Sequence, residues 1–188
     1  MTVNVMLDLE TWGCTPGSDI RSIGAVVFDF ESGRLPHEFY MATENRYWDD
    51  GGYCASGGWM KWPLTRDSST EEWWEKQSVS AQNAFENPVL LREALVHFSE
   101  WWHTFAGADA RLWAHGPQFD VSILEACYQA CEISVPWHYR APRDTRTIWD
   151  FHNPDLPFDG TPHHALDDAK YQARKLILAV NHLGIEQQ

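Results

Sequence analysis

The chain has 188 residues and a mass of 21.7 kDa, which is the size of one ordinary globular domain. Hydrophobic residues make up 44% of it and charged residues 22%, which excludes intrinsic disorder of the whole chain and allows a sizeable core. The net charge of −13 works against a general attraction for nucleic acid or anionic membranes. Any polyanionic substrate would therefore need local basic residues or bound cations.

Three features of the sequence indicate where in the cell the protein is expected: membrane spans, a signal peptide and the spacing of the cysteines. No apolar run approaches the roughly 18 residues of a membrane span, and the N-terminus lacks the basic flank and long apolar region of a signal peptide. The cysteines show no Cys-x-x-Cys spacing, which argues against a zinc clip or a disulfide framework. We therefore expect a reduced, cytoplasmic setting and no membrane partner.

The first part of the chain predicts an antiparallel meander. Alternating apolar residues from Val3 to Glu10 indicate a strand, and 20–30 is a second run rich in Val, Ile and Phe. A turn at 31–34 suggests a hairpin into a third strand near 37–43. Residues 44–68 have no clear periodicity, so we expect a long loop there, of the kind that is usually functional or mobile.

Helices dominate the remainder of the chain. We first expect a short helix that carries Trp73, Trp74 and Gln77 and is capped by Ser68 or Ser69, and then a helix from Pro88 with an apolar stripe from Leu91 to Phe105. A strand at 111–115, a helix at 119–132 and a β/α stretch should follow. The last helix should run from about His164 to His182 and end before Gly184. This order predicts an α/β or α+β sheet with helices packed on it, in a single domain spanning 1–188.

Asp8 and Glu10 stand two residues apart on the first predicted strand, so both side chains leave the same face. The alternate, apolar residues from Val3 to Leu9 form the face that must be buried. Adjacent carboxylates repel each other unless a cation lies between them, so a divalent metal ion is their natural partner. A solvated strand face is the simpler alternative, but the pair ends the first strand, where active sites of layered α/β folds often lie.

Two later segments supply further candidates. Asp120 opens or precedes a helix, where its simplest role is to complement the helix dipole. His163 and Asp168 are five residues apart, so they converge only if His163 lies in the loop before the last helix and Asp168 lies in its first turns. Pro162 supports that boundary. The alternative is an acidic first turn with solvated histidines.

The order and spacing of these residues resemble those of the DnaQ-like, or DEDDh, 3′–5′ exonucleases. The matching stretches extend from the first strand to the last helix and are Leu7–Thr11, Trp113–Asp120 and His163–Ala169. The segment from Glu72 to Gln77 is also similar to the Trp-Trp-x-x-Gln segment of a phage and bacterial exoribonuclease branch. In such relatives this helix lies against the terminal nucleotide.

The resemblance implies a ribonuclease H-like α/β fold, with an antiparallel meander of the first three strands, further parallel strands, and helices on both faces. It implies a metal-dependent 3′–5′ exonuclease that releases nucleoside 5′-monophosphates from single-stranded or overhanging 3′ ends. Whether the substrate is RNA or DNA stays open, because the residue that would contact a 2′-hydroxyl cannot be identified from the sequence.

The resemblance also assigns roles to residues. His163 would be the general base, because family spacing fits it better than His164, and Asp167 would likewise stand outside the chemistry. Two Mg²⁺ or Mn²⁺ ions would be held by Asp8, Glu10, Asp120 and Asp168. Contacts to substrate are expected from Leu9, Thr11, Trp12, Trp74, Gln77, Phe119 and Arg143. Because adjacent helical residues point about 100° apart, we expect Trp74 to border the groove and Trp73 to pack in the core.

Two other functions remain as alternatives. One is a non-catalytic nucleic-acid-binding module on the same fold, which the complete set of four carboxylates and a histidine disfavours. The other is a phosphoesterase for small phosphate esters, which would have no need of the tryptophan helix. Many relatives form dimers, so a homodimer is possible by analogy, but the sequence does not determine the oligomeric state.

Overall fold

A six-stranded mixed sheet forms the middle of the structure, a computed structural model that describes residues 2–44, 46–47, 53–55 and 58–185. The strand order is β7-β3-β2-β1-β8-β9. β2 pairs antiparallel with both β1 and β3, while β8 is parallel to β1, β9 to β8, and β7 to β3. The strands are β1 (Asn4–Thr11), β2 (Ile20–Phe28), β3 (His37–Glu44), β7 (Val89–Leu90), β8 (Arg111–Ala114) and β9 (Pro142–Asp144). The predicted meander with added parallel strands is confirmed.

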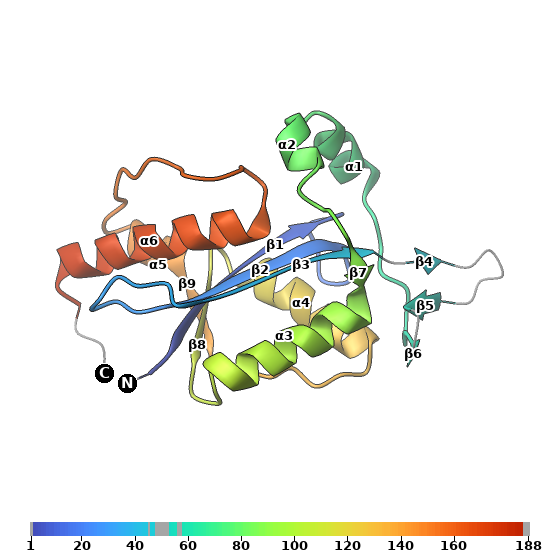
Figure 1. Ribbon diagram of the computed structural model, residues 1–188, viewed down its shortest axis with the longest axis horizontal. Coiled ribbons are helices and arrows are strands. Elements are labelled where there is room, and N and C mark those ends of the chain that lie inside the picture. The colour runs from blue at the N-terminus through green and yellow to red at the C-terminus, as the bar shows by residue number, and fades with distance from the viewer. Residues whose placement is uncertain (1, 45, 48–52, 56–57, 186–188) are drawn as a thin grey trace.

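Helices cover both faces of this sheet, as expected. α5 and α6 lie on one face, and α3 and α4 lie on the other, while α1 and α2 stand beyond one end of the strands (Figure 1). Their bounds are α1 (Ser68–Glu75), α2 (Val79–Gln82), α3 (Leu91–Phe105), α4 (Asp120–Ala130), α5 (Thr145–Trp149) and α6 (Ala165–Leu183). Among the described residues, no helix is both long and apolar enough to cross a membrane.

The alternation along β1 divides the core into two layers. Val5 and Leu7 are fully buried against residues of α3 and α4. Met6, which points the other way, is fully buried in a second cluster with Val26 and with Leu176 of α6. Because both faces are covered, Asp8 and Glu10 on the α6 side lie under a helix and not on a solvated face.

Two helix starts differ from the prediction. The carboxylate of Asp67 accepts the backbone N–H of Ser69 at 2.9 Å, so Asp67 is the N-cap of α1 and neither serine is. α3 begins at Leu91 and not at Pro88, because Val89–Leu90 first pair with the end of β3 as the short strand β7. The first difference arises from the residue just before the predicted helix, and the second from pairing with a distant strand.

The apolar stripe of α3 also differs at its end. Phe105 is 38% exposed and stacks on His37 with ring centroids 4.1 Å apart, whereas Trp101 is buried. Phe105 is the last residue of the helix and meets the first residue of β3, where the sheet no longer covers it.

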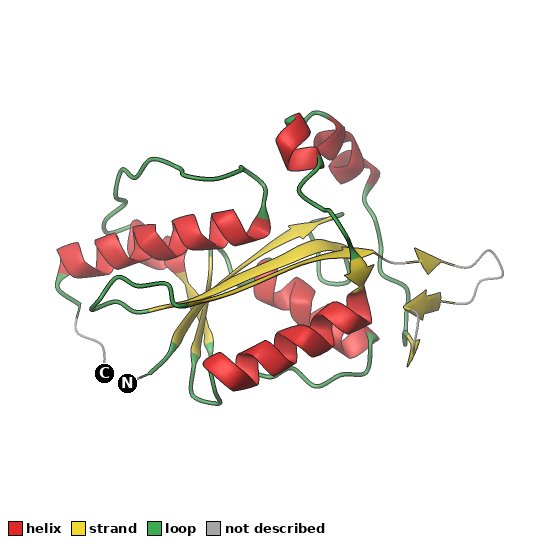
Figure 2. Cartoon of the chain, in the orientation of Figure 1, coloured by secondary structure: helices red, strands yellow, loops and turns green. Residues whose placement is uncertain are grey.

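The segment expected as a long loop contains short strands. β4 (Arg46–Tyr47), β5 (Tyr53–Ala55) and β6 (Gly58–Trp59) form a small antiparallel sheet that stands apart from the main one (Figure 2). Strands of two or three residues are too short to show an alternating pattern in the sequence. The rest of the predicted loop at 45, 48–52 and 56–57 lies outside the described residues.

Glycine is required where α6 meets the sheet. A Cβ added at Gly24 on β2 would lie 2.1 Å from the carbonyl carbon of Ala165 and 2.2 Å from the nitrogen of Leu166. The first turn of α6 therefore rests directly on the backbone of β2, opposite Asp8, which is the register partner of Gly24. At its other end α6 stops at Gly184, whose φ of 62° is left-handed, as the sequence predicted.

Gly24→Ala should push the start of α6 away from β2. We expect a loss of at least about 1–3 kcal/mol in the free energy of unfolding, because the methyl group would overlap backbone that cannot rotate aside. Hydrogen exchange in the first turn of α6 should become faster. Gly33→Ala is the control: its Cβ would meet nothing within 4 Å, so its left-handed φ of 69° costs stability without disturbing α6. Unchanged exchange in α6 of Gly24→Ala would contradict this account.

Candidate active site

Four carboxylates from three elements meet beyond the carboxyl end of β1. Asp8 and Glu10 leave β1 toward α6, and Asp168 lies in the first turn of that helix. Asp120 is the first residue of α4, and its Oδ1 accepts the backbone N–H of Leu9 at 3.2 Å. That bond fixes Asp120 between the two acidic residues of β1. The structure thus brings together acids that are up to 160 positions apart in the chain (168 − 8).

A cavity of about 520 Å³ opens over these carboxylates. Asp8, Glu10 and Asp168 line it together with His163. Leu9, Thr11, Trp73, Trp74 and Phe119 are among the other residues that line it. The cavity combines acidic groups at its base with aromatic groups on its sides.

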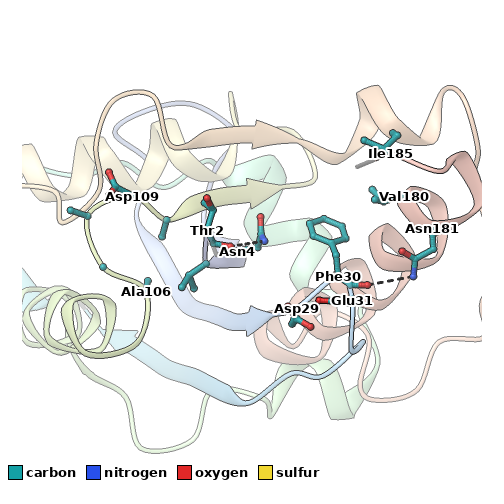
Figure 3. Close-up of a pocket in the computed structure, with 14 residues that line it drawn as sticks. Thr2, Asn4, Asp29, Phe30, Glu31, Ala106, Asp109, Val180, Asn181 and Ile185 are labelled. Atoms are coloured by element: carbon teal, nitrogen blue, oxygen red, sulfur yellow. Dashed lines mark hydrogen bonds between the residues drawn. The ribbon is translucent and has the colours of Figure 1, made fainter. Parts of the chain in front are cut away.

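A larger cavity, of about 1000 Å³, lies elsewhere and contains none of the predicted site residues. Asn4, Phe30 and Asn181 line it, and Figure 3 shows Asn181 reaching toward the backbone of Phe30. It adjoins the first residues of β1, whereas Asp8 and Glu10 are near the other end of that strand. Volume alone would therefore have pointed to the wrong end of the sheet.

Removal of the four acids from water raises the pKa of each. Burial raises the pKa of Asp8 well above its usual value, and the charges of Asp120, Glu10 and Asp168 raise it further, against one hydrogen bond from Gln172. Burial also raises the pKa of Asp120 to about 7 and that of Asp168 to about 6. The acids are thus close enough, and dry enough, that ionising all of them without a cation is unfavourable.

The pKa of Glu10 is raised as well, and one positively charged neighbour partly offsets the shift. Burial and then the charge of Asp168 raise its pKa to about 8, while the guanidinium of Arg21 acts in the opposite direction. Glu10, His163 and Asp168 each offer a ligand atom, and these atoms lie within 4.8 Å of one another. Hard oxygen donors in a buried, electron-rich cluster fit a divalent cation such as Mg²⁺ or Mn²⁺.

His163 stands just outside α6, in a left-handed backbone conformation with φ of 62°. This conformation turns its ring toward the cavity, where the ring meets the edge of Trp73 at a centroid distance of 4.8 Å. Partial burial lowers the pKa of His163, so the imidazole is neutral at neutral pH. A neutral imidazole beside a carboxylate cluster is suited to accept a proton from water.

His164 and Asp167 hold the junction between loop and helix. His164 is the N-cap of α6, and its Nδ1 accepts the backbone N–H of Asp167 at 3.4 Å. Its ring stacks on Tyr40 with centroids 4.2 Å apart. The carboxylate of Asp167 accepts the backbone N–H of Thr161 at 3.0 Å. These contacts fix where the helix begins and therefore where His163 and Asp168 lie.

A match to a family model identifies the family of the chain. The model for the 3′-5′ exoribonuclease Rv2179c-like domain matches residues 3–179, which include all four carboxylates and His163. The chain belongs to this family. It is a 3′–5′ exonuclease. No protein with a curated description matches its sequence.

Solved structures share the fold of this exonuclease at low sequence identity. The nuclease domain of 3′hExo, a DEDDh family member bound to rAMP, is 14% identical with a TM-score of 0.61, over 99% of this chain and 94% of that one. Cell-death related nuclease 4 is 12% identical with a TM-score of 0.62, over 98% and 65%. E. coli exonuclease I in complex with a dA16 oligonucleotide is 9% identical with a TM-score of 0.65, over 97% and 41%. The exonuclease chain thus spans less than half of exonuclease I.

The tryptophan pair differs from the prediction in which of the two rings is buried. Trp74 is only 3% exposed, and its indole N–H donates to the carbonyl oxygen of Thr11 at 2.9 Å. Trp73 is 42% exposed and faces His163. The expectation that Trp73 packs in the core was wrong. Trp74 lines the cavity as expected, but it is buried, because the carbonyl of Thr11 provides an acceptor that turns its indole inward. Gln77 lies beyond the end of α1 and its amide donates back to the carbonyl of Trp73.

The other predicted substrate residues divide into two groups. Leu9, Thr11 and Phe119 line the cavity of the exonuclease. Trp12 does not, because its ring lies beneath the guanidinium groups of two arginines. Arg143 on β9 does not line the cavity either, and its Nη1 donates to backbone carbonyls at residues 140–142.

Gln172 is a site residue that sequence reasoning missed. Its amide Nε2 donates to Oδ1 of Asp8 at 2.6 Å, and the residue lines the cavity. It follows Asp168 by four residues, so both lie on the face of α6 that covers β1. That spacing was the available signal. The hydrogen bond fixes the position of Oδ1 of Asp8 and thereby the orientation of its carboxylate.

The reversed tryptophans lead to different costs for their removal. Trp74→Ala should lower the free energy of unfolding by about 3–5 kcal/mol, because it leaves a cavity in the core and removes the indole N–H that donates to the carbonyl of Thr11. Trp73→Ala should cost less than about 1 kcal/mol, since a half-exposed ring buries little. Urea unfolding of both variants measures this difference. Equal losses would mean that Trp73 supports the fold as well.

The carboxylates should make the metal-free exonuclease less stable as pH rises. Each group binds its proton more tightly in the folded protein, so the stabilisation is complete below pH 4 and is lost as pH rises through the folded-state pKa values of about 6 to 8. With chelator present, we expect the free energy of unfolding to fall by at least about 1.4 kcal/mol between pH 5 and pH 8. Glu10→Gln should flatten this slope, and added Mg²⁺ should raise the melting temperature more at pH 8 than at pH 5. Stability that rises over this range would contradict it.

Proposed function

We propose that this exonuclease removes nucleoside 5′-monophosphates one at a time from the 3′ end of RNA, single-stranded or as an overhang. The observation that carries the proposal is that Asp8, Glu10, Asp168 and His163 line one aromatic-walled cavity, while Asp120 is held beside them by the backbone N–H of Leu9. The description of the family as exoribonucleases supports RNA as the substrate. Binding of rAMP by the similar domain of 3′hExo is consistent with a ribonucleotide in such a cavity.

The metal ions would be Mg²⁺ or Mn²⁺, and two would be held by Asp8, Glu10, Asp120 and Asp168. Their raised pKa values support this assignment, because a cation would permit all four to ionise. When bound, such ions supply positive charge for the phosphate and the departing oxygen and make a water molecule easier to deprotonate. Gln172 contributes by fixing the orientation of Asp8.

His163 would accept the proton of the attacking water. The water oxygen bonds to phosphorus and the bond from phosphorus to the 3′ oxygen of the preceding nucleotide breaks, which leaves a 5′-phosphate on the released nucleoside. The departing oxygen takes a proton from solvent and becomes the new 3′-hydroxyl. The lowered pKa of His163 keeps the imidazole unprotonated and ready for this role.

Trp73 is our candidate for stacking on the terminal base, because it is the more exposed of the two tryptophans that line the cavity. Its exposed ring lies beside His163, at the side of the cavity. An aromatic face stacks on any base and contributes about 1–3 kcal/mol without reading its identity. Leu9 and Phe119 would provide apolar walls for the same nucleotide. Little sequence preference is expected from such contacts.

Digestion of matched RNA and DNA strands, labelled at the 5′ end, tests the proposal. With Mg²⁺ or Mn²⁺ the RNA should shorten stepwise from its 3′ end, and with chelator neither strand should. His163→Ala should lower kcat by about two to four orders of magnitude, the usual contribution of a general base. His164→Ala is the matched control and should lose less than tenfold, with about 1 kcal/mol of stability for the lost cap.

Three results would contradict parts of this account. Equal effects of the two histidine variants would remove His163 from its role. Faster digestion of DNA would make deoxyribonucleotides the substrate. Hydrolysis of a simple chromogenic phosphate ester at a higher rate than either strand would favour a phosphoesterase for small molecules.

A further inference from the structure

Arg21 occupies an irregular position in the sheet beside Glu10. In the pairing of β1 with β2, Glu10 lies opposite Ser22 and Thr11 lies opposite Ile20, so Arg21 has no partner on β1. This is a β-bulge, a device that redirects one side chain and is common next to active sites. The bulge falls directly beside a carboxylate of the catalytic cluster.

The redirected guanidinium of Arg21 lies among three aromatic rings. It is 3.7 Å from the ring centroid of Phe85, 3.9 Å from that of Trp74 and 4.3 Å from that of Trp12. These rings come from three segments: the residue after β1, helix α1, and the stretch that follows α2. One cation therefore joins the end of the catalytic strand to helix α1 and to the segment that follows α2.

We call residues 67–85, which include α1 and α2, the cap. Figure 1 shows α1 and α2 beyond the end of the main sheet. The cap is attached by the indole of Trp74 to Thr11, by the backbone N–H of Asp67 to the carbonyl of Trp12 at 2.7 Å, and by the hydroxyl of Tyr40 to the carbonyl of Ala84. The aromatic cluster around Arg21 fills the space between these attachments.

The cap contacts the catalytic histidine through Trp73. Its ring contacts the ring of His163 edge to face, at an interplanar angle of 80°. Because Trp74, the next residue, is fixed against Arg21, a shift of α1 would move Trp73 relative to His163. Arg21 also places a positive charge near Glu10.

We propose that Arg21 is a positioning residue of the exonuclease reaction, which fastens the cap to the catalytic strand and thereby places Trp73 against His163. The inference rests on the proposed role of His163. An arginine is needed because a planar guanidinium can stack on several rings at once and still remain charged, whereas a lysine ammonium is a compact, strongly hydrated charge.

The test compares Arg21→Met, which keeps an apolar side chain but no charge, with Arg21→Lys, which keeps the charge but not the plane. Phe85→Ala removes one ring of the cluster and leaves the Arg21 and Glu10 side chains unaltered, so it replaces Arg21→Met in the test if that variant does not fold. Lys175→Met is the matched control, because Lys175 lies 4.7 Å from the ring of Trp149 in another part of the molecule. Each variant is measured twice: hydrogen exchange of the cap amides in chelator, and kcat and KM on labelled RNA with Mg²⁺.

In Arg21→Met and Phe85→Ala the amides of α1 should exchange about tenfold faster, since the helix opens locally. In both, kcat should fall by about tenfold to a hundredfold, as expected for a misplaced catalytic group. Arg21→Lys should keep more of kcat than Arg21→Met yet still show faster cap exchange. Lys175→Met should match the wild type in both measurements.

Wild-type kcat in Arg21→Met would overturn the proposal. A loss of kcat without faster cap exchange in Arg21→Met would also overturn it, because the effect would then come from the lost charge near Glu10 and not from the cap. The same result in Phe85→Ala would overturn it as well, because the cap would have kept its place. If the wild-type protein digests no strand, the proposed function fails instead, and the exchange measurements still decide whether Arg21 fastens the cap.

Discussion

Direct contact between the first turn of α6 and the backbone of β2 determines the geometry of the rest of the site. Gly24 permits that contact, and its register partner on β1 is Asp8. The same approach brings Asp168 and Gln172 of α6 over the end of β1. Had the helix been held off by a side chain, the carboxylates of strand and helix would lie too far apart to act on one ligand.

This close approach carries an electrostatic cost that the apolar layers offset. Four acids with raised pKa values oppose one another in a poorly hydrated place. Fully buried side chains on both faces of the sheet, such as Leu7 on one and Met6 on the other, provide the stabilisation that keeps the acids together. Fold and site thus draw on different residues of the same strand: Met6 shares a face with Asp8 and Glu10 but lies nearer the start of β1, and Leu7 lies on the other face.

The sequence predicts the sheet and most helices because their periodic patterns are long. It also places Asp8 and Glu10 on one face of a strand, whereas the grouping of Asp120, His163 and Asp168 with them depended on a resemblance. Local patterns did not predict how α1 is rotated about its axis, because the buried acceptor of Trp74 is a backbone carbonyl of β1. The β-bulge at Arg21 and the short strand β7 were missed for the same reason: each exists only through pairing with a distant segment.

The left-handed backbone of His163 has a consequence for how the protein can evolve. A φ of 62° is unfavourable for a residue with a Cβ, and a glycine at this position would relax it. Selection for stability alone would therefore favour glycine, and only selection for turnover would retain a side chain here. Activity and stability are in conflict at this position, and a descendant released from the need for catalysis would be expected to lose this histidine early.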